Sequence, residues 1–203
     1  MMADQEHTLE IGRLLRAGTA GFVVGCRVTQ LTTPSFGALV RVPLEDEYQI
    51  YGLIHDIRID DDGLVRQLVT AEGIDDSIIS DNRLNRNVPL EIGVLAVGYS
   101  QTGRVFHLLP PRPPLSEDVI YLSNAEENRQ FTTHGRLGYI RHILRNADLP
   151  VGELLAAHLK QASEAHLLQG NRAWLGKATQ ELITLLRDDY PALKGVLGAL
   201  SDI

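Results

Sequence analysis

The amino-acid sequence predicts an α+β protein in which a small antiparallel β-barrel precedes a C-terminal bundle of α-helices. Residues 21–109 contain short apolar or alternating runs bounded by turn residues, which is typical of strands. From about residue 125 onward, apolar residues recur every three or four positions, which is typical of helices. Between the two halves, residues 110–114 read "PPRPP", which forbids a continued strand ladder and favours a stiff connector.

The strand half contains six candidate strands with the spacing of hairpins. A closed antiparallel barrel suits them better than a parallel sheet, because no helical pattern separates the runs. Glycines in "DDDG" (60–63) and "SQTG" (100–103) suit tight turns. Residues 72–87 fit either a helical turn or a functional loop. The candidate strands are "GFVVGCRV", "GALVRVPL", "YQIYGLIHDIRI", "LVRQLVTA", "LEIGVLAVGYS" and "RVFHLLP".

The proline-rich segment is the best domain boundary in the sequence. Just beyond it, "DVIYLS" has the character of one last strand that returns to the barrel. We therefore expect a barrel domain over 1–115, a returning strand and linker over 116–127, and a helical domain over 128–203.

The helical half predicts four helices that form a small bundle. The candidate N-caps are Thr132 or Thr133, Asp148 and Asn171, while Pro150 fits a first turn, Gly170 marks a helix end and Tyr190-Pro191 a helix break. The expected inward stripes are Leu137, Ile140 and Leu144; Leu155, Leu159, Ala162 and His166; Leu175, Ala178, Leu182 and Leu185; and Leu193, Val196, Leu197 and Leu200.

Composition bounds the class of protein. The chain has 203 residues, of which 44% are hydrophobic and 22% charged, so neither disorder nor a fibrous repeat is indicated. No apolar run approaches the roughly 20 residues of a membrane helix, and "MMADQEHTLE" is unlike a signal peptide. We therefore expect a cytoplasmic protein without membrane insertion. The single cysteine, Cys26, lies among strand-forming residues and is predicted to be a buried structural thiol.

Net charge disfavours a protein whose whole surface coats nucleic acid. The formal charge is −7, although a local basic patch remains compatible with it. Residues 45–76 hold ten acidic side chains against Arg58 and Arg66, which predicts a negative rim.

The Gly-Lys pair at 176–177 raises the question of nucleotide binding. A P-loop needs four residues between its glycines and a hydroxyl after the lysine. Here five residues separate Gly170 from Gly176, and Ala178 occupies the hydroxyl position. The segment also has helical spacing, so we predict a helix end followed by a helix, and no ATPase site.

Carboxylates and histidines give no convincing catalytic or metal set. Asp56, Asp60 and Asp62 would suit a magnesium site if their hairpin brought them together, but "DDDG" is equally typical of an exposed turn. His134 and His142 are eight residues apart, as are His158 and His166, a spacing of about 12 Å along a helix. We predict satisfied core or surface histidines, with no catalytic residue, cofactor or metal ion.

One basic segment is the best candidate contact surface. Between Glu127 and Asp148 the sequence has no acidic residue. Arg141 and Arg145 are one helical turn apart and suit phosphate or the acidic rim of a partner. A solvated helix face is the alternative interpretation. The candidate contact residues are Arg136, Arg141 and Arg145.

Three segments resemble the HAS-barrel family, the small N-terminal barrels of HerA-type DNA translocases and rotary ATP synthases. They are "IGRLLRAGTAGFVVGCRV", "FGALVRVPLEDEYQIYGLIHDI" and "HLLPPRPPLSEDVIYLSNAEE", within about residues 10–127. The motifs are short and structural. The resemblance implies an opening strand pair, a close strand approach at Gly52, and a barrel that assembles into rings and docks accessory subunits. Family barrels usually precede a P-loop ATPase domain, whereas this chain continues with the helical residues 128–203.

These observations favour a non-catalytic interaction module that docks onto a separate ring-forming ATPase, such as a DNA translocase, or self-assembles into a homo-oligomer. One alternative is a nucleic-acid-binding barrel, which the 5% aromatic content disfavours because few rings are available for base stacking. A second alternative is a metal-dependent hydrolase that uses the carboxylates between Asp56 and Asp62.

Overall fold

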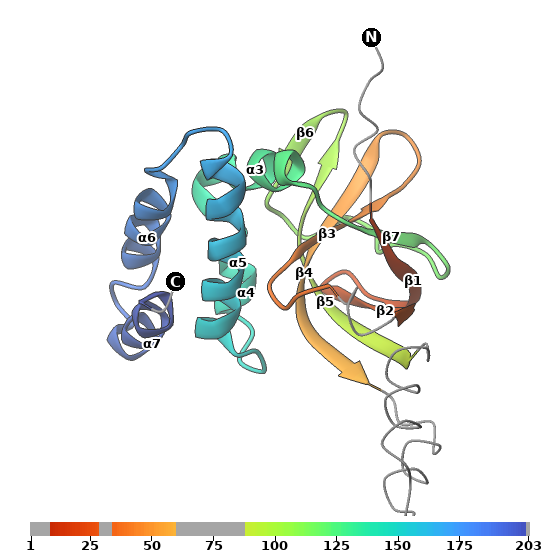
Figure 1. Ribbon diagram of the computed structural model, residues 1–203, viewed down its shortest axis with the longest axis horizontal. Coiled ribbons are helices and arrows are strands. Elements are labelled where there is room, and N and C mark those ends of the chain that lie inside the picture. Colours follow the sequence, from red (N-terminus) through yellow and green to blue (C-terminus); the bar gives the residue numbers. More distant parts are fainter. Residues whose placement is uncertain (1–8, 29–33, 60–87, 202–203) are drawn as a thin grey trace, which may run out of the picture.

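The computed structural model describes residues 9–28, 34–59 and 88–201. A closed antiparallel barrel of six strands is followed by helices, which confirms the predicted α+β class (Figure 1). The strands are β1 (Glu10–Ala17), β2 (Gly21–Val28), β3 (Leu39–Pro43), β4 (Tyr48–Ile59), β5 (Val88–Gln101), β6 (Arg104–Phe106) and β7 (Val119–Leu122).

The barrel closes through the pairing of β2 with β5. The order around the ring is β1-β7-β3-β4-β5-β2, and every neighbouring pair is antiparallel. β6 lies outside the ring and extends β5 as a hairpin. Its turn has positive φ at Thr102 (46°) and Gly103 (75°), as the "SQTG" motif predicts. Because closure pairs the edges of the ring, the short β6 is the one free edge among the strands that the structure describes.

The returning strand and the opening strand pair are both present. β7 pairs with β1 on one side and β3 on the other, so the chain returns to the barrel after its prolines. The alternating pattern does not predict β1, because the burial of its side chains is irregular around a bulge between Leu14 and Arg16. The candidate strand at 64–71, the turn at 60–63 and the segment 72–87 lie outside the described residues.

Apolar side chains fill the barrel interior. Gly52 of β4 allows close approach, since a Cβ there would collide with Val94 and lie 3.2 Å from the Phe22 ring. Cys26 is half-buried at the margin of this cluster, and burial raises the pKa of its thiol. The interior residues are Ile11, Leu14, Phe22, Val24, Ala38, Val40, Val42, Tyr48, Ile50, Ile54, Ile92, Val94 and Ile120.

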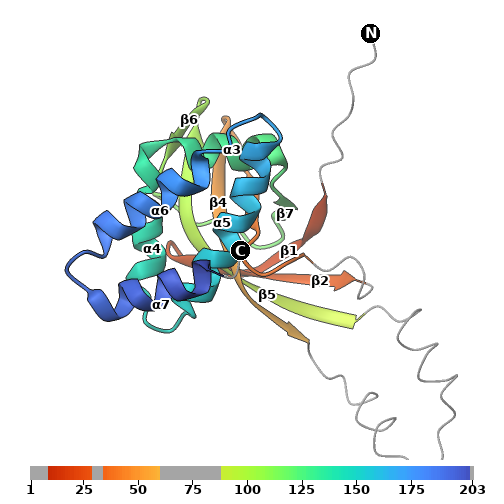
Figure 2. The ribbon, with the colours of Figure 1, turned by 60° about the vertical axis from the view of Figure 1, so that its left-hand side comes forward.

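The helices pack against one flank of the barrel. α5 lies between the barrel and the outer pair of α6 and α7, while α3 leads from the barrel into the helical layer (Figures 1 and 2). The helical elements are α3 (Ala125–Thr133), the 3-10 turn η2 (Gly135–Leu137), α4 (Ile140–Leu144), α5 (Val151–Leu167), α6 (Trp174–Leu185) and α7 (Tyr190–Leu200).

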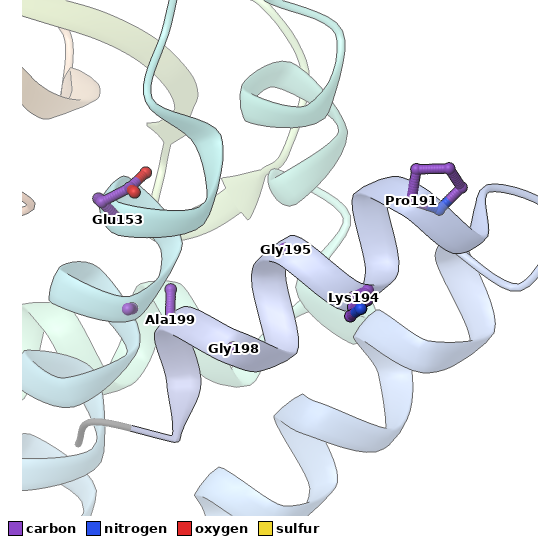
Figure 3. Close-up of a pocket in the computed structure, with 7 residues that line it drawn as sticks. Glu153, Pro191, Lys194, Gly195, Gly198 and Ala199 are labelled. Atoms are coloured by element: carbon purple, nitrogen blue, oxygen red, sulfur yellow. The ribbon is translucent and has the colours of Figure 1, made fainter.

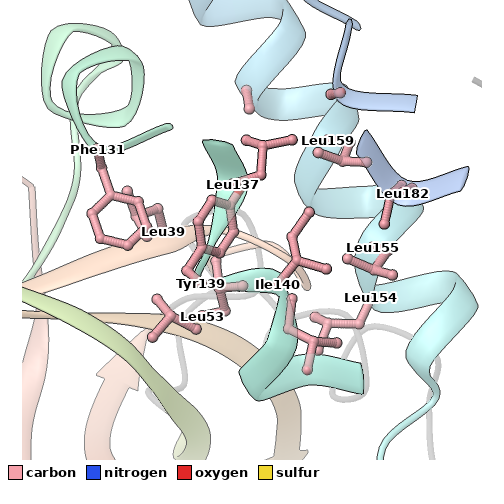
Figure 4. Packing of buried hydrophobic residues seen from close by; sticks show 14 of the residues in the cluster. Leu39, Leu53, Phe131, Leu137, Tyr139, Ile140, Leu154, Leu155, Leu159 and Leu182 are labelled. Atoms are coloured by element: carbon pink, nitrogen blue, oxygen red, sulfur yellow. The ribbon is translucent and has the colours of Figure 1, made fainter. Parts of the chain in front are cut away.

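A second apolar core joins the barrel to the helices. Leu39 and Leu53 leave the outer face of the barrel and meet Tyr139 and Ile140 from the helical side (Figure 4). Behind them, Leu155 of α5 continues the cluster toward α6 and α7. The helices therefore complete a core that the barrel shares with them.

The helical half begins at α3, near residue 125 as predicted, but with a different N-cap. Thr132 and Thr133 lie inside α3, so their assignment as N-caps is wrong. Asn124 caps the helix instead: its side chain accepts from the Glu127 N–H (2.8 Å), and the Glu127 carboxylate accepts from the Asn124 N–H (3.0 Å). The helix predicted from the stripe of Leu137, Ile140 and Leu144 is divided into two elements, η2 and α4.

Two other predicted caps are also wrong. Pro150, and not Asp148, occupies the N-cap position of α5, and Ala173, and not Asn171, occupies that of α6. Neither residue caps its helix through a side chain. The predicted break at Tyr190-Pro191 is confirmed, because α7 begins there.

The apolar stripes agree with prediction in α5 and differ in the outer helices. In α6, Ala178 and Leu182 are buried, but Leu185 is 49% exposed and Leu186 takes its place in the core. In α7 the predicted stripe faces the core but is less deeply buried: Val196 is buried, and Leu193 and Leu200 are half-buried against the same cluster. The predicted α5 stripe of Leu155, Leu159, Ala162 and His166 is buried throughout.

Candidate docking surface

The three candidate arginines lie on consecutive elements of the helical layer. Arg136 belongs to η2, Arg141 to α4, and Arg145 is the C-cap of α4. Arg136 and Arg145 are exposed, whereas Arg141 is half-buried. The Arg145 N–H donates to the Arg141 carbonyl (3.2 Å), which places these two residues one turn apart as expected. We call these three residues the arginine surface.

His107, which follows β6, anchors this surface to the barrel. Its backbone carbonyl accepts a hydrogen bond from the Arg141 guanidinium and lies 3.3 Å from His142 Nε2. Its own Nε2 lies 3.0 Å from the Phe131 carbonyl, so Nε2 carries the proton and donates. Burial lowers the pKa of His107 to about 4, which keeps the ring neutral. Arg141 is thus held in place, a role that sequence spacing does not reveal.

Arg136 lies in a left-handed turn that precedes the anchored Arg141 in the chain. Gly135, Arg136 and Leu137 have φ values of 57°, 47° and 56°. The glycine lies against the His107 ring, where a Cβ would be 2.9 Å from Nδ1. The reversal brings Leu137 into the shared core and leaves Arg136 in solvent. Side chains at positive φ carry a conformational cost, so the surrounding packing must hold this turn.

A buried histidine joins α5 to the barrel beneath this surface. His158 Nδ1 lies 3.2 Å from the Gly37 carbonyl, and Nε2 lies 2.9 Å from the Tyr139 hydroxyl oxygen. Because a carbonyl can only accept, Nδ1 carries the proton and Nε2 accepts from Tyr139. Burial lowers the pKa of His158 to about 4 and raises that of Tyr139. This residue is the satisfied core histidine that the sequence predicts.

An ion pair makes a second polar connection between the barrel and the helices. Arg41 of β3 places Nε 2.7 Å from Glu127 Oε1, while both side chains are largely buried. The other carboxylate oxygen of Glu127 accepts from the Asn124 N–H, as described for the cap. The Arg41 guanidinium also stacks 5.1 Å from the Tyr121 ring centre. Arg41 and Glu127 lie far apart in the sequence, so no local pattern predicts that they pair.

Two open depressions lie elsewhere on the described surface. A groove of about 690 Å³ runs between the first turn of α5 and α7 (Figure 3). Its lining is Glu153, Ala156, Pro191, Lys194, Gly195, Gly198 and Ala199. A second cleft, of about 440 Å³, lies where the β1–β2 hairpin and β5 meet His55 of β4 and Asn146 beyond α4. Burial lowers the pKa of His55.

The proposed carboxylate site is not assembled within the described residues. Asp56 pairs with Arg58 (2.6 Å), and Asp60 and Asp62 lie outside the described residues. Among residues 9–28, 34–59 and 88–201, no three histidines, cysteines or carboxylates are grouped to hold a metal ion. In the same residues, none of the helices combines the length and the apolar character needed to span a membrane.

The Gly-Lys segment is a helix end followed by a helix, as predicted. Gly170 has φ 77° in the turn after α5, and Gly176 and Lys177 lie inside α6. Trp174 stacks on His166 with ring centres 4.4 Å apart, which fastens the start of α6 to α5.

In comparisons with known proteins, the chain matches no family model and no curated protein.

Proposed function

We propose that the protein is a non-catalytic interaction module that docks onto a ring-forming P-loop ATPase, such as a DNA translocase. The observation that carries the proposal is the anchoring of the arginine surface on the barrel through His107. A cation held in place loses little conformational freedom when a partner binds, so it favours a specific contact. The likeness of residues 10–127 to HAS-barrel domains supports a ring ATPase as the class of partner.

The charges suit a protein partner that is acidic at the contact. The whole chain carries a formal charge of −7, yet residues 128–147 carry no acidic side chain. Arg136 and Arg145 are exposed, and each offers a planar fork that matches a carboxylate. The filled barrel interior leaves the outer surface for such contacts.

Direct nucleic-acid binding is the second candidate, because Arg136 and Arg145 are equally suited to phosphate. Such binding would weaken steeply as salt is raised. Stacking support is poor, since Phe22, Tyr51, Phe131 and similar rings are buried in the two cores. Docking onto an acidic protein is therefore the better-supported function.

Co-expression with the ring ATPase encoded nearest to this protein provides the test, with complex formation measured by size-exclusion chromatography and light scattering. The double reversal Arg136→Glu, Arg145→Glu is expected to weaken the complex about tenfold or more, because like charges then meet. The matched reversal Arg172→Glu, Arg187→Glu changes two exposed arginines elsewhere and should leave it intact.

Three results would contradict the proposal: no complex with the ATPase, equal loss in both double variants, or ATP hydrolysis by the isolated chain. A salt-sensitive shift of single- or double-stranded DNA, abolished by the first double variant, would favour the nucleic-acid candidate instead.

A further inference from the structure

The outermost helix, α7, has few polar side chains on its exposed face. Its sequence, "YPALKGVLGAL", contains one charged residue, Lys194. Val196 is buried, Leu193 and Leu200 are half-buried against the shared core, and Tyr190 is 72% exposed. A helix on the surface of a fold normally carries a polar outer face. The exposed residues of α7 are Tyr190, Pro191, Lys194, Gly195 and Gly198, so its outer face carries a single charge and two positions without a side chain.

Two glycines in α7 leave open space above the helix. A Cβ at Gly195 or Gly198 would meet nothing within 4 Å, so the described packing does not require glycine at either position. By contrast, a Cβ at Gly152 of α5 would touch the Gly195 carbonyl (3.4 Å) and Ala199 (3.5 Å), so that glycine serves the α5–α7 contact. Glycine in a helix interior lowers the stability of the helix, so two glycines that the described packing does not require destabilise α7. The groove above them admits the close approach of another helix.

Opposite charges stand at the two ends of this groove. Glu153 lies in the first turn of α5 and Lys194 in the first half of α7, and both are exposed. Neither forms an ion pair with the residues that the structure describes. The groove thus carries one acidic and one basic group that are free to meet a partner.

We infer that a second copy of the chain docks in this groove, with the two α7 helices antiparallel about a twofold axis between Gly195 and Gly198. A helix rises by about 1.5 Å per residue, so Lys194 and Ala199 lie at equal distances along α7 on opposite sides of this twofold axis. Ala199 and Glu153 line the same end of the groove. The axis therefore sets Lys194 of each copy against Glu153 of the other, and the interface is self-complementary.

This dimer adds an interface to the proposed function and does not depend on the ATPase. The arginine surface and the α5–α7 groove share no residue. Loss of one interaction should leave the other intact, so the two proposals fail separately.

Sedimentation velocity on the full chain, from about 1 μM to about 1 mM, tests the inference directly. The wild type is expected to show a reversible monomer–dimer equilibrium in this range. Lys194→Glu should raise the dimer Kd about tenfold or more, since it creates two like-charge contacts. The double variant Glu153→Lys, Lys194→Glu should restore the wild-type Kd. Lys177→Glu on α6 is the matched control and should leave the equilibrium unchanged.

A glycine replacement separates the interface from the fold. Gly198→Gln fills the groove with a better helix former, so it should abolish the dimer while raising the monomer Tm by about 2–4 °C. Gly176→Gln, at an equally open glycine of α6, should leave the dimer unaffected. A monomeric wild type at the highest concentration, a dimer indifferent to Gly198→Gln, or a charge-swapped double variant no better than Lys194→Glu would each overturn the inference. ATPase binding by the same samples reports on the proposed function separately.

Discussion

The barrel interior and the junction between barrel and helices are stabilised by different chemistry. The interior is filled by aliphatic side chains together with Phe22 and Tyr48. The junction also buries apolar side chains, but it contains the hydrogen-bonded His158, the neutral His107, and the pair of Arg41 with Glu127. The side chains of the barrel interior contribute by burial, whereas the junction adds polar side-chain contacts with defined partners.

The difference explains how two parts of distinct architecture are held in one relative orientation. Burial of apolar surface is non-directional, so it does not by itself choose one docked geometry. Buried hydrogen bonds are satisfied in only one arrangement, and an unsatisfied group costs more than the bond contributes. We therefore expect the polar contacts to fix the position of α5 on the barrel.

Truncating the aromatic centre of the junction should have the largest effect. Phe131 is fully buried, with ring centres of Tyr51, His107 and Tyr139 at 4.8, 4.8 and 5.1 Å. Phe131→Ala should lower the free energy of unfolding by about 3–5 kcal/mol, measured by urea denaturation. Ile92→Val in the barrel interior should cost about 0.5–1.5 kcal/mol. Two separate transitions in Phe131→Ala would show that the regions fold independently.

Acid should weaken the junction through His158. Its pKa is about 4 in the folded protein against 6.5 for a free histidine, so the unfolded state binds the extra proton between these values. The stability that His158 contributes is present above about pH 6.5 and is lost as the pH falls toward 4, by on the order of 3 kcal/mol.

His158→Gln removes one of two buried histidines in the junction and should reduce the stability lost between pH 7 and pH 4 by on the order of 3 kcal/mol. His107, whose pKa is also about 4, keeps its own contribution. His134→Gln, at an exposed histidine, is the matched control. An unchanged profile in His158→Gln would mean that His158 does not control the acid sensitivity of the junction.

The buried ion pair should matter more than an exposed one. Arg41→Met leaves the partly buried Glu127 without its cation and should cost about 1–3 kcal/mol by thermal or urea denaturation. Arg16→Met breaks the exposed pair with Glu91 and should cost less than about 1 kcal/mol. Equal losses of stability in Arg41→Met and Arg16→Met would show that the buried ion pair of the junction contributes no more than an exposed one.

The smallest expected effect lies at the start of the helical layer. Asn124→Ala removes the side-chain cap of α3 and should cost about 1 kcal/mol. Asn171→Ala, at the position wrongly predicted to cap α6, should change stability by less than about 0.5 kcal/mol. A larger loss at Asn171 than at Asn124 would contradict the observed caps.

Local patterns predict β2, β3, β4 and β5 of the ring, because each is a short apolar or alternating run bounded by turn residues. The candidate strand "RVFHLLP" instead forms β6 outside the ring, and the pairing of β2 with β5 that closes the barrel is not a local feature. The strand that returns after the prolines was also predictable from "DVIYLS". The N-cap of α3 was assigned wrongly although the sequence contains its signal, Asn124 followed three residues later by Glu127. Thr132 and Thr133 had the right chemistry for a cap but fall in the last turn of that helix.

The anchoring of the candidate surface could not be predicted from sequence. Arg141 donates to the carbonyl of a residue 34 positions away, and His158 meets Gly37 across 121 positions. Such contacts depend on how the helical layer sits on the barrel. The buried stripe of α6 also differs from the stripe that helical spacing predicts. The helix ends at Leu185, and the next residue, Leu186, enters the core in its place.

Native-state hydrogen exchange tests most directly whether the junction unites the barrel and the helices. We predict that amides of Leu53 in β4 and Leu159 in α5, both fully buried, exchange with the same opening free energy at neutral pH. Phe131→Ala should lower both values together. Exchange of Leu159 by a lower-energy opening that leaves Leu53 protected would contradict the account, because the helices would then detach without unfolding the barrel.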